Sequence, residues 1–262
     1  MVHVVPDILA RIVQRKRAEL MERSASRTEL EHRAEQRRDF RDFKSALLTR
    51  PPAILAEIKQ ASPSKGSLTS SFDPASIARI YERGGAAGLS VLTDRDFFQG
   101  SLGDLEAARA SANLPVLRKD FTIDESHVIE AAAHGADAIL LIAALLDEAE
   151  MRRFRELAAH FRMAALVEVH DREELQKALD SGAEIIGVNN RNLHTFEVTL
   201  ETSEDLAGRM PSSVIKVSES GIHSSADVRR LTTAGFKAFL VGEHLMKSSD
   251  PAAAIQALRA AS

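Results

Sequence analysis

The chain has 262 residues, of which 44% are hydrophobic and 27% charged, with a formal net charge of −4. This length suits one large α/β barrel, and 34 basic residues spread along a mildly acidic chain exclude the concentrated positive charge of a nucleic-acid-binding protein. The absence of cysteine excludes disulfides and thiolate metal sites. No apolar run reaches the roughly 18 residues of a membrane span, so we expect a cytoplasmic protein without membrane contact.

Residues 1–50 precede the first strand-like run and carry two apolar stripes at helical spacing. We predict that they form a helical extension packed on a catalytic domain of residues 51–262. The second stripe leads directly into the first strand, so its helix is expected to close the bottom of that domain. The first stripe consists of Ile8, Leu9, Ile12, Val13 and Leu20, and the second of Phe40, Phe43, Leu47 and Leu48.

Eight short apolar, β-branched runs alternate with amphipathic stretches that carry helix-start and helix-stop signals. Such alternation indicates parallel strands joined by right-handed crossovers, and eight units favour a closed (β/α)8 TIM barrel. An open doubly wound sheet is the alternative, but no GxGxxG follows the first strand. The runs are 53–59, 88–94, 115–120, 138–142, 164–169, 185–189, 214–220 and 238–242. The expected N-caps are Asp73, Asp124, Asp147, Asp171 and one of the pair Ser224-Ser225.

Charged and amide side chains gather where these strands end, whereas the strands begin with Ala, Gly, Pro and Val. A single charge at a strand end is more often a solvated loop residue than a catalytic group. Many of them confined to the carboxyl ends indicate an active site, because TIM-barrel chemistry occurs at that rim. The residues are Glu57, Lys59, Arg118, Lys119, Asp120, Glu168, Asn189, Glu219 and Ser220.

Two glycine-containing turns predict a phosphate site. Ser220-Gly221 follows the seventh strand, and Gly242-Glu243 follows the eighth and opens a short helical stretch, EHLM. Backbone N–H groups at loops 7 and 8 commonly bind phosphate, and the side chain of Glu243 must then point away. The loop from Gln60 to Ser71 is either a plain flexible connection or a lid that offers Lys65 to a substrate.

Aromatic and histidine residues near this rim could belong either to the core or to a binding site. Phe97, Phe98 and Phe121 are either core plugs or a wall for a flat aromatic ligand. Histidines follow four different strands, and none has the spacing of a metal pair, so we expect no metal site. These histidines are His170, His194, His223 and His244.

Eight strings in order along the barrel resemble the indole-3-glycerol-phosphate synthase family. The resemblance implies a TIM-barrel lyase of tryptophan biosynthesis that takes a phosphorylated small molecule, 1-(2-carboxyphenylamino)-1-deoxyribulose 5-phosphate. The enzyme would cyclise, decarboxylate and dehydrate it to indole-3-glycerol phosphate, with no metal or organic cofactor. The strings are EIKQASPSKG (57–66), SVLTD (90–94), FFQGS (97–101), LRKDF (117–121), LVEVH (166–170), GVNNRNL (187–193), SESGI (218–222) and VGEHLM (241–246).

The resemblance also implies a role for each matching residue. Lys119 would be the general acid in ring closure, Glu168 would act in the later proton transfers, and Glu57 and Lys59 would hold the reacting groups. Which carboxylate serves as acid or base in dehydration stays open. Gln60 and His244 depart from the residues usual in the family. The other expected contacts with the substrate are Ser62, Phe97, Phe98, Phe121, Asn189, Arg191, Leu193, Glu219 and Ser220, with Lys59, Ser220, Gly221, Gly242 and Glu243 at the phosphate.

Two other functions compete with this one. A Schiff-base aldolase would use Lys119 or Lys59 as a nucleophile with a depressed pKa, and a catalytically silent barrel would only bind a phosphorylated ligand. The complete set of strand-end lysines and glutamates argues against the silent barrel. We also expect a monomer or weak homo-oligomer, whose first helical stripe reaches the upper rim and helps to cover the phosphate side of the substrate.

Overall fold

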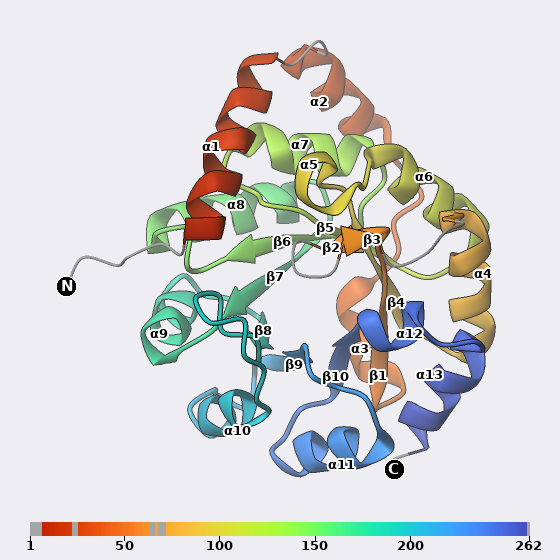
Figure 1. The fold of residues 1–262 in the computed structure, drawn as a ribbon. Coiled ribbons are helices and arrows are strands. Elements are labelled where there is room, and N and C mark those ends of the chain that lie inside the picture. The colour runs from red at the N-terminus through yellow and green to blue at the C-terminus, as the bar shows by residue number, and fades with distance from the viewer. Residues whose placement is uncertain (1–6, 23–25, 63–65, 68–71, 261–262) are drawn as a thin grey trace.

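The computed structural model describes residues 7–22, 26–62, 66–67 and 72–260. Eight parallel strands close into a barrel in the order β1-β10-β9-β8-β7-β6-β5-β4 (Figure 1). This closure confirms the predicted TIM barrel, and each of the eight predicted runs contains one strand. The strands are β1 Ala53–Ile58, β4 Gly88–Leu92, β5 Val116–Lys119, β6 Ala138–Ile142, β7 Ala164–Val169, β8 Ile185–Asn189, β9 Ile215–Glu219 and β10 Ala238–Val241.

Helices follow the strands and cover the outside of the barrel. Their starts confirm the predicted N-caps, with Ser224 as the capping residue of the pair Ser224-Ser225. The side chains of Asp73, Asp124, Asp147, Asp171 and Ser224 each accept a first-turn backbone N–H. The covering helices are α4 Pro74–Gly84, α6 Leu102–Ser111, α7 Glu125–Ala133, α8 Glu148–His160, α9 Arg172–Asp180, α10 Glu201–Ala207, α11 Ser225–Thr233 and α13 Pro251–Arg259. Shorter elements sit in the loops: α5 Arg95–Phe98, α12 Glu243–Met246 and an antiparallel hairpin of β2 Ala61–Ser62 and β3 Gly66–Ser67.

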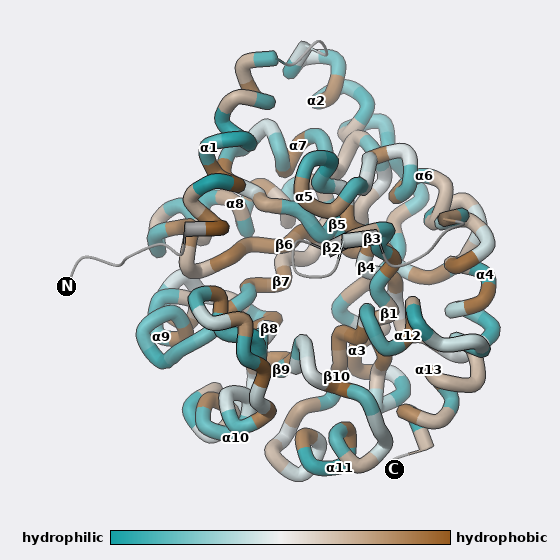
Figure 2. Tube along the Cα trace, viewed as in Figure 1, coloured by the Kyte–Doolittle hydropathy of each residue, from teal (hydrophilic) through white to brown (hydrophobic). Residues whose placement is uncertain are grey.

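Strand alternation divides the core into two layers. In β1, Ile54, Ala56 and Ile58 pack in the layer between strands and helices, whereas Leu55 packs inside the barrel with Leu117. Figure 2 shows this arrangement as apolar strands surrounded by helices of mixed hydropathy. Successive side chains of a strand point to opposite faces, so the side chains two and four residues after an inward residue also face the interior. Within the described residues, no helix has the length and apolarity to cross a membrane.

Three helices precede the barrel: α1 Asp7–Glu22, α2 Arg27–Gln36 and α3 Phe43–Thr49. From α3, Phe43 and Leu47 pack with the residues that begin the strands, such as Ala53 and Ala138, at the bottom of the barrel interior. Helix α2 packs along α7 on the outside, and α1 crosses to the upper rim (Figure 1). The extension therefore contacts the barrel at the bottom, the side and the top.

A buried carboxylate fixes the segment between α2 and α3 to the bottom of the barrel. Asp137, directly before β6, is 1% exposed and pairs with the guanidinium groups of Arg37 and Arg109. Its Oδ1 also accepts the backbone N–H of Arg41 (3.1 Å), and its Oδ2 accepts that of Val116 (3.0 Å). Both carboxylate oxygens of Asp137 are therefore bonded to a cation and to an amide.

Candidate active site

A cavity of about 380 Å³ opens at the carboxyl ends of the barrel strands. Its floor is formed by inward side chains such as Leu140 and Leu240, and its walls by the loops above them. Most residues predicted for the site line it: Glu57, Lys59, Phe98, Lys119, Phe121, Glu168, Asn189, Arg191, Leu193, Glu219, Ser220, Gly221, Gly242 and Glu243. Phe97 is not among the lining residues. Ser62 belongs to β2, and its side chain, like all of Lys65, lies outside the described residues.

Lys119, at the end of β5, is the central cation of the cavity. Its Nζ lies 2.9 Å from Glu168 Oε2, on β7, and 3.8 Å from Glu219 Oε2, on β9. Burial favours a neutral amine, but the negative charges of Glu168, Glu219 and Glu57 outweigh burial and raise the pKa of Lys119 above its ordinary value. The lysine is therefore an ammonium ion at neutral pH.

Glu219 is a carboxyl group with an incomplete set of partners. It is 2% exposed, and its Oε1 accepts no hydrogen bond from the described residues. Burial raises the pKa of Glu219 and the neighbouring charge of Glu168 adds to this, so that the pKa reaches about 8 despite Lys119. At neutral pH Glu219 mainly carries a proton that it can donate.

Glu168 is held in the opposite protonation state. Besides Lys119, its partners are Asn189, whose Nδ2 donates to Oε1 (3.0 Å), and His170, whose Nε2 lies 3.3 Å from Oε1. Burial would raise the pKa of Glu168, but Lys119 and His170 hold it well below its usual range. Two carboxyls with pKa values pushed apart are typical of an acid–base pair.

His170 follows β7 and stands between two carboxylates. Its Nδ1 lies 2.9 Å from Glu174 Oε2, and its backbone N–H donates to the same oxygen (2.8 Å). Burial lowers the pKa of the ring, but the contacts with Glu168 and Glu174 outweigh this effect and raise it to about 10. The imidazole is therefore a cation in the neutral range. The sequence considered His170 only as a metal ligand, and the buried carboxylates on both sides give it another use.

Two glycines make room for the acidic side chains. A Cβ at Gly187, in β8, would lie 2.1 Å from Glu219 Oε1, and one at Gly242 would lie 2.2 Å from Glu57 Oε1. Contacts this short do not occur in folded proteins, so any other residue would displace the carboxylates. Glu57 in turn pairs with Lys59, with 2.6 Å between Oε1 and Nζ.

The loops after β9 and β10 form one side of the cavity. Ser220 (φ 67°) and Gly221 (φ 78°) both have left-handed backbone, and Ser220 Oγ donates to Asn189 Oδ1 (2.9 Å). Helix α12 begins at Glu243, as predicted, and the carboxylate of Glu243 pairs with Lys247 (2.8 Å). The backbone N–H groups that open α12 have no partner within that helix.

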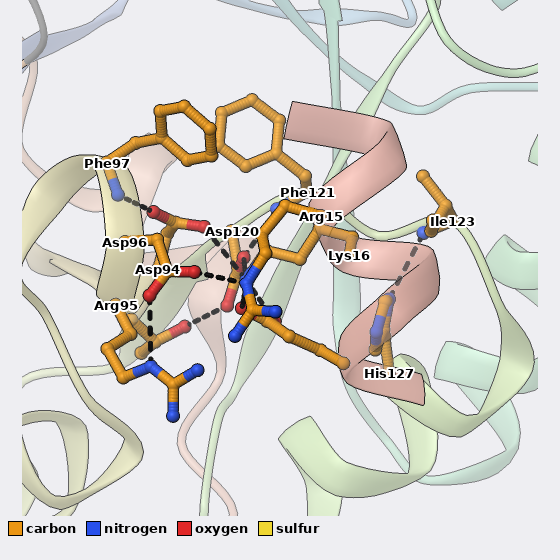
Figure 3. Close-up of polar contacts among 12 residues, drawn as sticks. Arg15, Lys16, Asp94, Arg95, Asp96, Phe97, Asp120, Phe121, Ile123 and His127 are labelled. Carbon is orange, nitrogen blue, oxygen red and sulfur yellow. Dashed lines mark hydrogen bonds and ion pairs between the residues drawn. The ribbon is translucent and has the colours of Figure 1, made fainter. Parts of the chain in front are cut away.

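The opposite side of the cavity is apolar. The rings of Phe98 and Phe121 lie 6.1 Å apart, centre to centre, and Ile8, Leu9 and Ile12 of α1 also line the cavity. We expected α1 on the phosphate side, but its ion pairs are with the loops after β4 and β5, which carry these two phenylalanines (Figure 3). Helical periodicity identifies an apolar face without identifying the loop that it meets, and the coverage of the phosphate side by α1 stays a prediction.

The described residues contain no group of three or more His, Asp or Glu side chains that could hold a metal ion. The carboxylates of the strand-end cluster are paired with cationic side chains instead. Lys59 pairs with Glu57, and Lys119 and His170 lie beside Glu168. This arrangement suits proton transfer to and from an organic substrate, with oxygen and aromatic groups bound at opposite sides.

A family model described as indole-3-glycerol phosphate synthase matches residues 9–258. The indole-3-glycerol phosphate synthase of Leptothrix cholodnii is 52% identical over 258 residues, covering 96% of this chain and 98% of that protein. The one from Burkholderia vietnamiensis is 50% identical over 255 residues, covering 95% and 97%.

Solved structures match the fold at much lower identity. Thiamine phosphate pyrophosphorylase from Pyrococcus furiosus has a TM-score of 0.60 at 17% identity, covering 81% of this chain and 96% of that one. KGPDC from Streptococcus mutans has a TM-score of 0.61 at 12% identity, covering 80% and 97%. These two likenesses concern the barrel alone. With the family match and the relatives at about 50% identity along almost its whole length, this chain belongs to the indole-3-glycerol phosphate synthase family.

Proposed function

We propose that the chain catalyses its family's reaction with Lys119, Glu168 and Glu219 as the acid–base group. The reaction converts 1-(2-carboxyphenylamino)-1-deoxyribulose 5-phosphate to indole-3-glycerol phosphate, carbon dioxide and water. The observation that carries the proposal is the position of Lys119 Nζ, 2.9 Å from Glu168 and 3.8 Å from Glu219 in the cavity.

In ring closure, the ring carbon that bears the carboxylate attacks the ketone carbon of the sugar. A carbon–carbon bond forms, and the carbonyl oxygen takes a proton from Lys119. An ammonium group supplies both the proton and the positive charge that stabilises the developing alkoxide. Carbon dioxide then leaves, and the electrons of its bond restore the aromatic ring. Because rearomatisation drives this step, we propose that no metal or organic cofactor takes part.

Dehydration requires an acid and a base at the same time. We assign the acid to Glu219, which gives its proton to the departing hydroxyl, and the base to Glu168, which takes a proton from the neighbouring methylene carbon. The assignment rests on their opposite pKa shifts, to about 8 for Glu219 and below the usual range for Glu168. Asn189 bonds to Glu168 and accepts from Ser220, and so keeps the base in position.

The two ends of the substrate require different surroundings. We assign its phosphate to the loops after β9 and β10, with Ser220, Gly221, Gly242 and Glu243 offering backbone N–H groups, and with Lys59 and Arg191 at the edge. Its aromatic ring then lies toward Phe98, Phe121 and Leu193. The support is the order of the strands around the barrel, since Phe98 and Phe121 follow β4 and β5 whereas the glycine turns follow β9 and β10.

We further propose that the enzyme works as a monomer or weak homo-oligomer in the cytoplasm, with residues 1–50 as an extension of the barrel domain 51–262. The support is that the described residues of this one chain line the cavity, and that a chain without cysteine has no need of an oxidising compartment. Gel filtration at micromolar concentration tests the oligomeric state.

The direct test is turnover of the purified protein, followed by the fluorescence of the indole product. Appearance of the product with release of carbon dioxide supports the proposal, and binding without product identifies a silent barrel. Borohydride added with the substrate distinguishes the aldolase, because reduction would link a lysine covalently to the ligand. A Schiff base is not expected, since the carboxylates around Lys119 keep its amine protonated.

A further inference from the structure

A lysine of the N-terminal extension is buried against the loops of the active site. Lys16, on α1, is 4% exposed, and its Nζ lies 2.9 Å from Asp94 Oδ2 and 2.9 Å from Asp120 Oδ1 (Figure 3). A third carboxylate, Glu19, lies 3.1 Å away on the same helix. Burial would lower the pKa of Lys16, but Asp120 and Asp94 raise it above its ordinary value. The lysine is therefore an ammonium ion at neutral pH.

Both barrel partners of Lys16 belong to loops that shape the cavity. Asp94 follows β4 and caps α5, since its Oδ1 accepts the backbone N–H of Phe97 (2.8 Å). Asp120 directly follows Lys119 in the chain, and its Oδ1 accepts the backbone N–H of Phe121 (2.8 Å). One ammonium group thus joins the cap of the helix that carries Phe98 to the turn between Lys119 and Phe121.

The two carboxylates depend on Lys16 to different degrees. Asp120 also pairs with Arg118 (3.0 Å) and accepts from Thr93 Oγ1 (2.6 Å), so its position on the barrel is fixed without α1. Asp94 is fully buried, and the oxygen that does not cap α5 is the one that meets Lys16. Loss of Lys16 would therefore leave a buried charge on the α5 side of the cavity.

Stability alone gives little reason for such a contact. Buried ion pairs can often be replaced by apolar side chains without loss of stability, and their best attested use is to specify one arrangement of the packed elements. Helix α1 already has an apolar face, and Ile8, Leu9 and Ile12 on that face line the cavity. Lys16 stands one turn beyond Ile12 and fixes where this face lies over the loops.

We infer that Lys16 is a positioning residue that holds α1 on Asp94 and Asp120, and so sets the apolar wall formed by α1, Phe98 and Phe121. The inference rests on the proposed function in one respect, the assignment of this wall to the aromatic ring of the substrate. It implies that Lys16 governs affinity for the aromatic half of the substrate and leaves the phosphate half unaffected.

The test compares Lys16→Met with Arg17→Met, which removes one positive charge from an exposed position on the same helix. Anthranilate and inorganic phosphate, each used as a competitive inhibitor of turnover, report the two halves of the site separately. We expect Lys16→Met to raise the inhibition constant of anthranilate and the KM of the substrate about tenfold, with the constant for phosphate within twofold. Arg17→Met should change neither, and Lys16→Arg should restore most of the loss.

A second variant separates loss of the ion pair's positioning effect from a failure to fold. In Lys16→Met with Asp94→Asn both charges are removed, and asparagine still caps α5. We expect its melting temperature to approach that of the parent while anthranilate affinity stays low. Recovery of anthranilate affinity in the double variant, or an equal loss of phosphate and anthranilate affinity in Lys16→Met, would overturn the inference. A parent protein without turnover would instead refute the proposed function, and direct calorimetric binding of the two inhibitors would still decide the role of Lys16.

Discussion

Two buried carboxyl groups lie at opposite ends of the barrel and differ in how completely they are bonded. At the bottom, Asp137 receives two guanidinium groups and two backbone amides. At the top, Glu219 has one oxygen that accepts nothing from the described residues and another that lies 3.8 Å from its nearest cation, Lys119. The exposed fractions of the two residues are almost equal, 1% and 2%, so burial does not explain the difference.

The difference separates a group that stabilises the fold from one that is available for chemistry. A buried polar group is normally fully hydrogen-bonded, and an exception needs a reason. The exception at Glu219 leaves its pKa near 8 and its proton transferable, at some cost in stability. Asp137, with its bonds complete, has nothing to offer a substrate and holds the extension to the barrel.

The largest expected effect is on stability, at the bottom of the barrel. Asp137→Asn removes the buried countercharge of Arg37 and Arg109 and leaves them only the exposed Asp39. Removal of one partner from a buried ion pair costs about 3–5 kcal/mol. Urea denaturation should show this loss in the free energy of unfolding. At a temperature where the variant is folded, kcat should match the parent, and a lowered kcat with unchanged stability would contradict the division of roles.

The second prediction concerns Lys119, in the cavity at the carboxyl ends of the strands. Lys119→Met removes the ammonium group but keeps a side chain of similar length. Because Glu168 keeps His170 and Asn189 as partners, the barrel should stay folded with a smaller loss of stability than Asp137→Asn. Loss of the acid should lower kcat at least about a hundredfold. Single-turnover fluorescence measures the chemical step directly, and near-normal turnover would remove Lys119 from the mechanism.

The third prediction concerns Glu219→Gln, for which rate and stability should move in opposite directions. Because the folded-state pKa of about 8 lies above the ordinary value of 4.5, the fold favours the protonated acid. Its contribution to stability is present below pH 4.5 and is lost as the pH rises through 8. The variant should therefore be more stable than the parent at pH 9 and about equal at pH 4.

The same variant should lose its proton donor. We expect kcat to fall at least about tenfold. We also expect kcat/KM of the parent to decline above pH 8 and that of the variant to show no such decline. The exposed Glu173→Gln is the matched control and should change neither property. A parent profile that is flat from pH 7 to 9 would exclude Glu219 as the acid.

The sequence predicted the barrel and most of the cavity because both depend on local order. Turn glycines, capping aspartates and the parity of inward residues at strand ends are all read within a few positions, as Leu117 and Lys119 illustrate. Roles that depend on distant partners could not be read in this way. Lys16 meets Asp94 and Asp120 from about 80 and 100 residues away, and the opposite pKa shifts of Glu168 and Glu219 arise from neighbours on other strands.

The smallest expected effect is that of a substitution at His170. This residue is intermediate between Asp137 and Glu219 in how completely it is bonded. Its backbone N–H and Nδ1 are bonded to Glu174, while its Nε2 only lies beside the proposed base Glu168, at 3.3 Å. His170→Asn removes a cation from beside Glu168 while Lys119 remains, so the pKa of that carboxyl should rise part of the way toward its ordinary value. We expect kcat to fall about threefold to tenfold, with the acidic limb of the pH–rate profile shifted upward.

The folded-state pKa of His170, about 10 against an ordinary 6.5, means that its contribution to stability is present below pH 6.5 and lost as the pH rises through 10. Thermal melts at pH 6 should therefore separate this variant from the exposed control His160→Asn more clearly than melts at pH 10. A lowered melting temperature with an unshifted acidic limb would assign His170 to the fold alone.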